Sequence, residues 1–100
     1  MDTSKSNNKN TVTLTLTGLL DVRSSAKLEA ELMSLFTETD KNITLDFKGV
    51  TYVSSSGLRV LLTGEKTAKK EGRTMTIINV SSFVMQIFDV TGFSNNLTFG

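Results

Sequence analysis

The sequence predicts an α/β fold in which helices cover mainly one face of a mostly parallel sheet. Strand-like and helix-like patterns alternate from Thr11 to Phe99, an order that implies right-handed crossovers between parallel strands. Two of the strands carry apolar residues on one side only, which indicates a sheet with one covered face. The length of 100 residues suits a single small domain with one core.

The first ten residues, MDTSKSNNKN, contain no apolar residue after Met1. We expect residues 1–10 to be disordered, because nothing in this segment can be buried against a core. The alternative is a short edge strand that turns across Asn7 and Asn8. Residues 11–100 are expected to form the single domain.

Four segments of that domain have the pattern of strands. Residues 11–17 and 43–47 alternate strictly between apolar and polar side chains, as half-buried strands do, so the threonines of the first should face water. Residues 75–80 are apolar on both sides, which is typical of a central or partly covered strand. Residues 97–99 are a plausible last strand.

Three helices are expected between these strands. The first carries an apolar stripe at helical spacing, formed by Leu28, Leu32, Leu35 and Phe36, and Ser24 or Ser25 would cap it. The second follows a short polar turn and three serines, and ends at Gly72. The third begins after Ser81 or Ser82 and ends at Gly92.

Composition excludes several classes of function. The net charge of +1 gives no basic face for nucleic acid. The chain has no cysteine and no histidine, so disulfides, thiolate metal sites and the commonest general base are all missing. No convergent carboxylate pair is evident, and we expect neither an enzyme nor a bound cofactor. The amino terminus lacks an apolar signal region, and no later apolar run could span a bilayer, so we expect a soluble, cytoplasmic protein without membrane insertion.

Three consecutive serines, Ser54 to Ser56, precede Gly57 at the predicted start of the second helix. One serine would satisfy the need for an N-cap, and a plain cap is the alternative to a functional site. Glycine weakens a helix interior by roughly 1 kcal/mol relative to alanine. The use of Gly57 therefore suggests that another group approaches the backbone here too closely for a side chain to fit. A phosphate on one of these serines would be tolerated, because a helix amino end favours negative charge. We interpret the segment as a docking and modification site.

Two catalytic interpretations of this segment fail. The Walker phosphate-binding loop ends in a lysine followed by serine or threonine, whereas Leu58 and Arg59 follow Gly57 here. A hydrolase nucleophile elbow needs a glycine two residues before its serine, and a serine triad needs a base that this chain does not offer. Asp21, after the turn TGLLD, is either a capping residue or a partner contact, with neither favoured.

Three segments in the same order resemble the STAS domains, the family of anti-sigma factor antagonists. LDFKGVTYVSSSGLRVLL is similar to the family signature, TGLLD to the turn before the family's first helix, and SSFVMQIFDVTGF to its late helix. The resemblance implies a mixed sheet of four to five strands and a protein that binds partners rather than catalysing a reaction. Many members add a carboxyl-terminal helix, and none is evident in this chain.

The resemblance also implies a mechanism of partner switching. Ser55 matches the serine that an anti-sigma factor serine kinase phosphorylates; the unmodified protein binds that kinase, and a PP2C-type phosphatase removes the phosphate. The family's aspartate before this serine is Ser54 here. The partner-binding surface would comprise Asp21, Ser54, Ser56, Gly57, Leu58 and Arg59. The alternative is a STAS subunit that docks on the ATPase of a transport complex without being phosphorylated, which Ser54 fits somewhat better.

Overall fold

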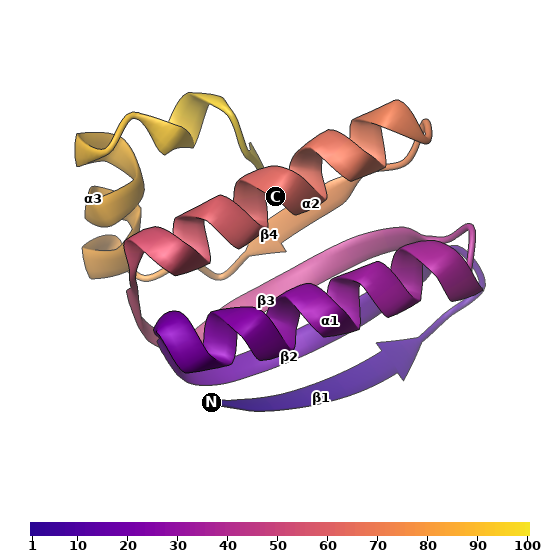
Figure 1. The fold of residues 1–100 in the computed structure, drawn as a ribbon, viewed down its shortest axis with the longest axis horizontal. Helices are drawn as coiled ribbons and strands as arrows, with labels where there is room; N and C mark the ends of the chain where they lie inside the picture. The colour runs from indigo at the N-terminus through magenta and orange to yellow at the C-terminus, as the bar shows by residue number, and fades with distance from the viewer.

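The computed structural model describes residues 1–100 as one sheet with helices packed on it (Figure 1). The sheet has five strands in the order β1-β2-β3-β4-β5. In chain order the elements are β1 (Asp2–Asn7), β2 (Thr11–Leu20), α1 (Val22–Glu38), β3 (Asn42–Val53), α2 (Ser55–Lys70), β4 (Met75–Ile78), α3 (Ser82–Val90), a short 3-10 helix (Phe93–Asn95) and β5 (Thr98–Phe99).

The sheet is mixed, as predicted. Strands β2 to β5 pair with their neighbours in parallel, and only β1 pairs antiparallel, with β2. Helices α1 and α2 lie side by side in front of the sheet, and α3 lies at the end from which α2 starts (Figure 1). The prediction of an α/β sheet with helices mainly on one face is therefore confirmed.

The preferred expectation for residues 1–10 was wrong, and its alternative is what forms. Residues 2–7 are the edge strand β1, paired with β2 from Asp2 opposite Thr17 to Asn7 opposite Val12. The turn follows Asn7, and its Asn8 side chain accepts hydrogen bonds from the backbone N–H groups of Asn10 and Thr11. Backbone pairing, rather than buried apolar area, holds this strand in place.

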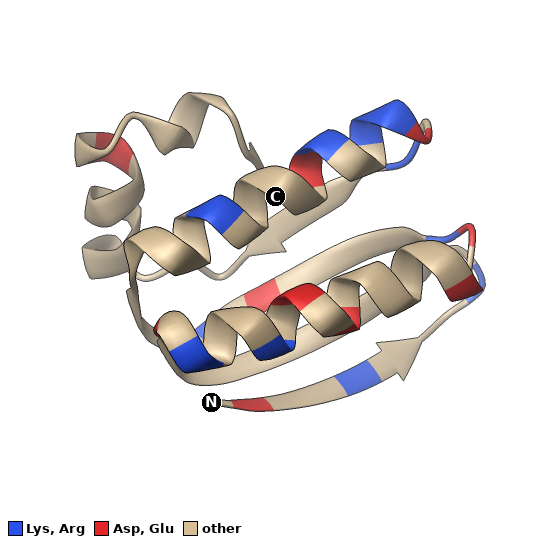
Figure 2. Cartoon of the chain, viewed as in Figure 1, with Lys and Arg blue, Asp and Glu red and all other residues tan.

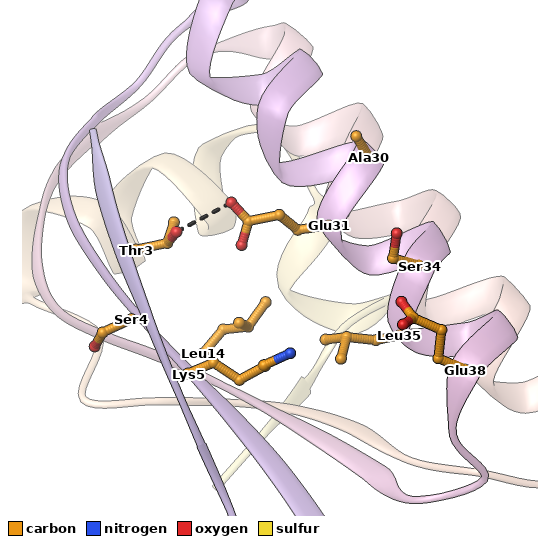
Figure 3. Close-up of a pocket in the computed structure, with 9 residues that line it drawn as sticks. All are labelled: Thr3, Ser4, Lys5, Leu14, Ala30, Glu31, Ser34, Leu35 and Glu38. Carbon is orange, nitrogen blue, oxygen red and sulfur yellow. Dashed lines mark hydrogen bonds between the residues drawn. The ribbon is translucent and has the colours of Figure 1, made fainter.

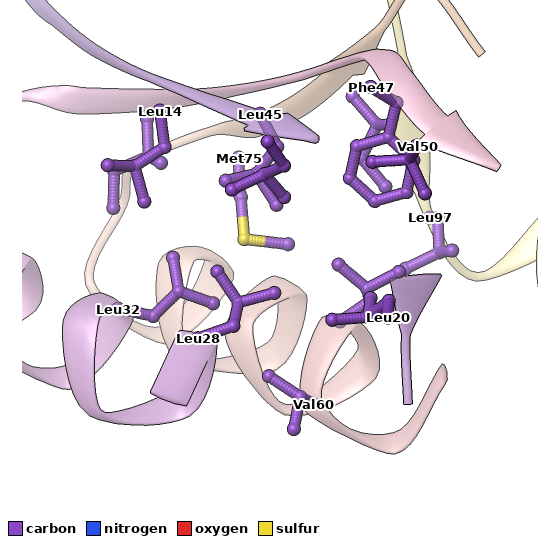
Figure 4. Packing of buried hydrophobic residues seen from close by; sticks show 14 of the residues in the cluster. Leu14, Leu20, Leu28, Leu32, Leu45, Phe47, Val50, Val60, Met75 and Leu97 are labelled. Atoms are coloured by element: carbon purple, nitrogen blue, oxygen red, sulfur yellow. The ribbon is translucent and has the colours of Figure 1, made fainter. Parts of the chain in front are cut away.

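The core lies between the sheet and the helices (Figure 4). Leu14, Leu45 and Met75 project from the strands towards Leu28 and Leu32 of α1. On the other side of the core, Phe88 of α3 packs its ring 6.3 Å from that of Phe47 on β3. The apolar residues of the two alternating strands and of the first helix's stripe are all among the 22 that form this cluster, whereas Ile78 and Val80 of the predicted strand 75–80 are only partly buried.

Strand β3 is longer than expected and replaces the predicted polar turn. It runs to Val53, directly before the serines. The pairing between β2 and β3 shifts twice, between Thr15 and Thr17 and between Gly18 and Leu19, so β3 accommodates its extra residues as bulges. Within this longer strand, Gly49 lies where an added Cβ would be 2.5 Å from a methyl of Thr17. Strand β3 is therefore followed directly by Ser54 and the start of α2.

The helix ends differ from expectation at one position. The N-cap of α1 is Asp21, and neither Ser24 nor Ser25 caps it; both serines are buried in its first turns. Ser81 caps α3, as one of the two predicted alternatives. Gly72 follows the end of α2 with a φ of +71°, in the left-handed region where glycine is favoured.

Candidate functional site

The serine triplet lies where β3 passes into α2, next to the end of β2. The Ser54 N–H donates to the carbonyl of Leu20 at 2.9 Å, which ties the start of α2 to β2. The Ser54 hydroxyl accepts from the N–H of Gly57 at 3.2 Å and is the N-cap of the helix. The fold therefore uses Ser54 for its own structure, as the capping interpretation required.

Ser55 is the first residue of α2 and its side chain is exposed. Ser56 beside it is half-buried. The first turn of α2 contains no acidic residue, so the positive end of the helix dipole is not offset there. Of the three serines, Ser55 is thus free of the capping role and the most open to an incoming group.

Gly57 and Leu58 are not part of an accessible surface. A Cβ at Gly57 would lie 2.7 Å from Cγ of Leu20 and 3.1 Å from its carbonyl oxygen. Leu58 is only 3% exposed. The element that comes close to the bare backbone of Gly57 is β2, not a partner. The prediction that these two residues contact a partner is corrected accordingly.

Asp21 and Arg59 are both exposed at this end of the molecule. The Asp21 carboxylate accepts from the Ser24 N–H at 3.0 Å, while the Asp21 N–H donates to the Ser24 hydroxyl at 2.9 Å, a reciprocal capping box. The hydrogen bond from the Ser24 backbone, followed by the one from its hydroxyl, lowers the pKa of the Asp21 carboxyl below its ordinary value near 3.8. Asp21 is therefore a cap, and its exposure leaves it available to a partner.

Asp21→Asn is expected to lower stability at pH 7, because the amide is a weaker acceptor than the carboxylate. The pKa of Asp21 is lower in the folded than in the unfolded chain, so its contribution is present above the unfolded value and is lost as pH falls through the folded value. Urea unfolding of parent and variant from pH 7 to pH 3 should show the gap in midpoint closing in the acid range. A gap that stays constant would contradict this role of the charge.

Comparisons with known proteins agree on one family. A family model described as "Mlab, STAS domain" matches residues 3–98. The anti-sigma-B factor antagonist of Bacillus subtilis is 32% identical over 85 residues, which cover 85% of this chain and 77% of that protein. The chain belongs to the STAS domain family.

Solved STAS structures confirm the fold. The unphosphorylated anti-sigma factor antagonist SpoIIAA superposes with a TM-score of 0.83 at 18% identity, over 99% of this chain and 88% of that chain. The phosphorylated form of SpoIIAA from Bacillus gives 0.76 at 17% identity, over 99% and 91% of the two chains. The resemblance drawn from three short segments is thereby confirmed.

The position at which this STAS domain departs from the family signature is the N-cap. Ser54 stands where the signature has aspartate. Serine and aspartate are both strongly preferred N-cap residues because either side chain accepts a hydrogen bond from the first helical turn. The hydrogen bond from Gly57 to Ser54 shows that this role is retained.

Four exposed apolar side chains, not predicted from the sequence as site residues, lie on the elements that end or begin at this end of the domain. Leu19 and Tyr52 are paired neighbours near the ends of β2 and β3 and are 51% and 44% exposed. Val22 opens α1 and is 72% exposed, while Phe83 in the first turn of α3 is 58% exposed. The sequence does contain a sign of them: they are large apolar residues that fall outside the periodic positions expected to be buried, and they lie next to the predicted helix starts.

Few charges accompany these apolar residues. Figure 2 shows most of the charged residues of α2 towards its far end, and in the sequence of the helix Arg59 is the charged residue nearest to its start. At the start of α1 lie Asp21 and Arg23. This end of the STAS domain thus combines exposed apolar groups with a few charges, a composition found at protein interfaces.

Asp21 lines an open hollow of about 310 Å³ together with Met1, Arg23, Ser24 and Lys27. A hollow of about 460 Å³ lies elsewhere, between β1 and α1 (Figure 3). Leu14 and Leu35 contribute apolar groups to it, and Lys5, Glu31 and Glu38 contribute charges. None of the predicted site residues lines it.

The chain has no group of three or more acidic, cysteine or histidine residues that could hold a metal ion. None of its helices combines the length and the apolar character needed to cross a membrane.

Proposed function

We propose that this chain is an anti-sigma factor antagonist that binds an anti-sigma factor serine kinase and is released when the kinase phosphorylates Ser55. The observation that carries the proposal is the division of roles between adjacent serines. Ser54 caps α2, whereas Ser55 stands exposed at the first helical position. Relatives named anti-sigma-B factor antagonist support the same function.

The docking surface in this proposal consists of Asp21, Ser55 and Arg59, together with the exposed apolar residues Leu19, Val22, Tyr52 and Phe83. Large apolar groups supply most of the binding energy at the centre of an interface when water is excluded from them. A phosphate adds about −1.5 to −2 charges at pH 7. Within such an interface it would be buried at high cost, so a bound kinase would be released.

The chemistry belongs to the kinase. The γ-phosphoryl group of ATP passes to Oγ of Ser55, a new P–O bond forms, and the bond to ADP breaks. The proton of the hydroxyl passes to a carboxylate of the kinase, and Mg²⁺ offsets the charge on the phosphates. A PP2C-type phosphatase then hydrolyses the phosphate ester with water, which restores the Ser55 hydroxyl and releases inorganic phosphate.

Incubation with ATP, Mg²⁺ and a cognate kinase, taken from the genes neighbouring this one, tests the proposal. The intact mass should increase by one phosphate in the parent and in Ser56→Ala, and remain unchanged in Ser55→Ala. Ser56→Ala is the matched control, because it removes the adjacent hydroxyl of the same helix turn. Modification of Ser55→Ala, or absence of modification in all three, would reject the proposed acceptor.

A second function is favoured by a specific observation. The matching family model is described as "Mlab, STAS domain", and the signature aspartate is absent at Ser54. In this alternative the same surface holds a transport ATPase permanently and Ser55 is never modified. Transporter genes beside this gene, with no kinase or phosphatase gene, would favour it.

A further inference from the structure

We infer that Arg59 receives the phosphate of phosphorylated Ser55 within the same chain, so that modification changes two residues of the docking surface at once. The inference rests on the proposed function, because it concerns the phosphorylated form. It adds to that function a partner for the phosphate inside the protein itself.

The spacing of the two residues on α2 carries the inference. Ser55 and Arg59 are four residues apart on one helix, and both are exposed. Residues at this spacing lie about 5 to 6 Å apart at their Cβ atoms, so side chains of moderate length can meet. An acidic group four residues before a basic group is also the better orientation for such a pair. Phosphorylation would place the acidic group at the first of these positions.

Arg59 is available for this pairing. The two ion pairs of the chain join Lys69 to Glu65 and Arg73 to Glu71, and Arg59 belongs to neither. No acidic residue lies in the first turn of α2 to compete for it. A guanidinium group can donate two parallel hydrogen bonds to a phosphate, which a shorter or less directional cation could not match.

The pairing has a consequence for regulation. In the unmodified protein the guanidinium of Arg59 is open to a partner. In the phosphorylated protein it is held against the first turn of α2 and its charge is largely offset. Phosphorylation would therefore add an anion to the docking surface and withdraw a cation from it.

Phosphorus NMR of protein with phosphoserine installed at position 55 by synthesis tests the inference without any kinase. Arg59→Gln should raise the second pKa of the phosphate by about 0.2 to 0.4 units, the equivalent of the roughly 0.3 to 0.5 kcal/mol of an exposed helical ion pair. Arg59→Lys should retain part of the effect. Added salt should reduce the difference between parent and Arg59→Gln.

Lys66→Gln is the matched control for charge on the same helix. Lys66 is exposed and lies eleven residues beyond Ser55, roughly 16 Å at the rise of a helix, farther than the screening length of about 10 Å in 0.1 M salt. It should leave the phosphate pKa unchanged. Arg23→Gln tests the other arginine at this end of the molecule.

Equal pKa values in parent and Arg59→Gln would overturn the inference, and so would a larger shift from Arg23→Gln than from Arg59→Gln. Because the phosphate is installed chemically, these outcomes do not depend on the proposed function. A kinase that never modifies Ser55 would defeat that function while leaving the pairing measurable. Conversely, modification by a kinase with no effect of Arg59 would defeat the pairing alone.

Discussion

Ser55→Glu is expected to weaken binding of the cognate anti-sigma factor kinase by roughly 30-fold to several-thousand-fold, which corresponds to the 2 to 5 kcal/mol lost when a charge is buried unpaired in an interface. The glutamate carboxylate would lie among exposed apolar groups such as Tyr52 and Phe83, which the kinase would cover. Isothermal titration calorimetry with parent and variant measures the loss.

The free Ser55→Glu protein should remain folded. Acidic residues stabilise the first turn of a helix, since they offset the positive end of its dipole, and the cap at Ser54 is untouched. Circular dichroism and urea unfolding should therefore match the parent or show slightly higher stability. A variant that fails to bind because it is unfolded would be detected by these measurements.

Thr67→Glu is the matched control for Ser55→Glu. Thr67 is half-buried on α2, twelve residues beyond Ser55 and eight beyond Arg59, and the substitution adds the same charge away from the docking end. It should bind the kinase like the parent. If both variants bind normally, the docking surface lies elsewhere on the domain. Normal binding of a transport ATPase by Ser55→Glu would instead favour the constitutive alternative.

Sequence patterns predicted the elements that bury apolar side chains and missed the one that does not. The alternation in residues 11–17 placed β2 correctly because Val12, Leu14 and Leu16 must all be buried together. Strand β1 has no such signal. It is held by backbone hydrogen bonds to β2 and by the hydroxyl of Thr3, which donates to Glu31 at 3.0 Å. Backbone pairing has no counterpart in a pattern of side chains.

The helix start at Asp21 shows a second limit. Serine and aspartate are both good caps, and local preference could not choose between Asp21 and the serines at positions 24 and 25. Tertiary packing decides between these residues, because Ser24 lies inside the first turn and its hydroxyl donates to the carbonyl of Leu19 at 2.7 Å. Only the position of β2 relative to α1 decides where that helix begins.

The candidate site was predicted in part. The exposed position of Ser55 follows from the order of strand, cap and helix, which the sequence contains. The role of Gly57 does not follow, because a glycine can admit a partner or a neighbouring strand, and the sequence carries no information about which one is near. The distance from Gly57 to Leu20 decides it.

Gly57→Ala is expected to destabilise the protein by about 1 to 3 kcal/mol, the usual cost of overpacking a core. The new methyl would lie 2.7 Å from Cγ of Leu20, whose side chain is fully buried, and 3.1 Å from a backbone oxygen that cannot easily move. Alanine favours a helix over glycine by roughly 1 kcal/mol. If Gly57 served only to admit a partner, the substitution would therefore stabilise the free protein. Urea unfolding distinguishes these two roles of Gly57, because overpacking lowers the free energy of unfolding and a role in admitting a partner alone would raise it.

Gly64→Ala is the matched control for Gly57→Ala on the same helix. A Cβ at Gly64 would meet first the sulfur of Met75, at 2.8 Å. The methionine side chain is flexible and can move aside, so the helical gain of about 1 kcal/mol offsets most of the crowding. We expect stability within about 1 kcal/mol of the parent. Equal losses in both variants would mean that α2 tolerates no added methyl on its buried face, and would contradict a specific role for the close contact between Gly57 and Leu20.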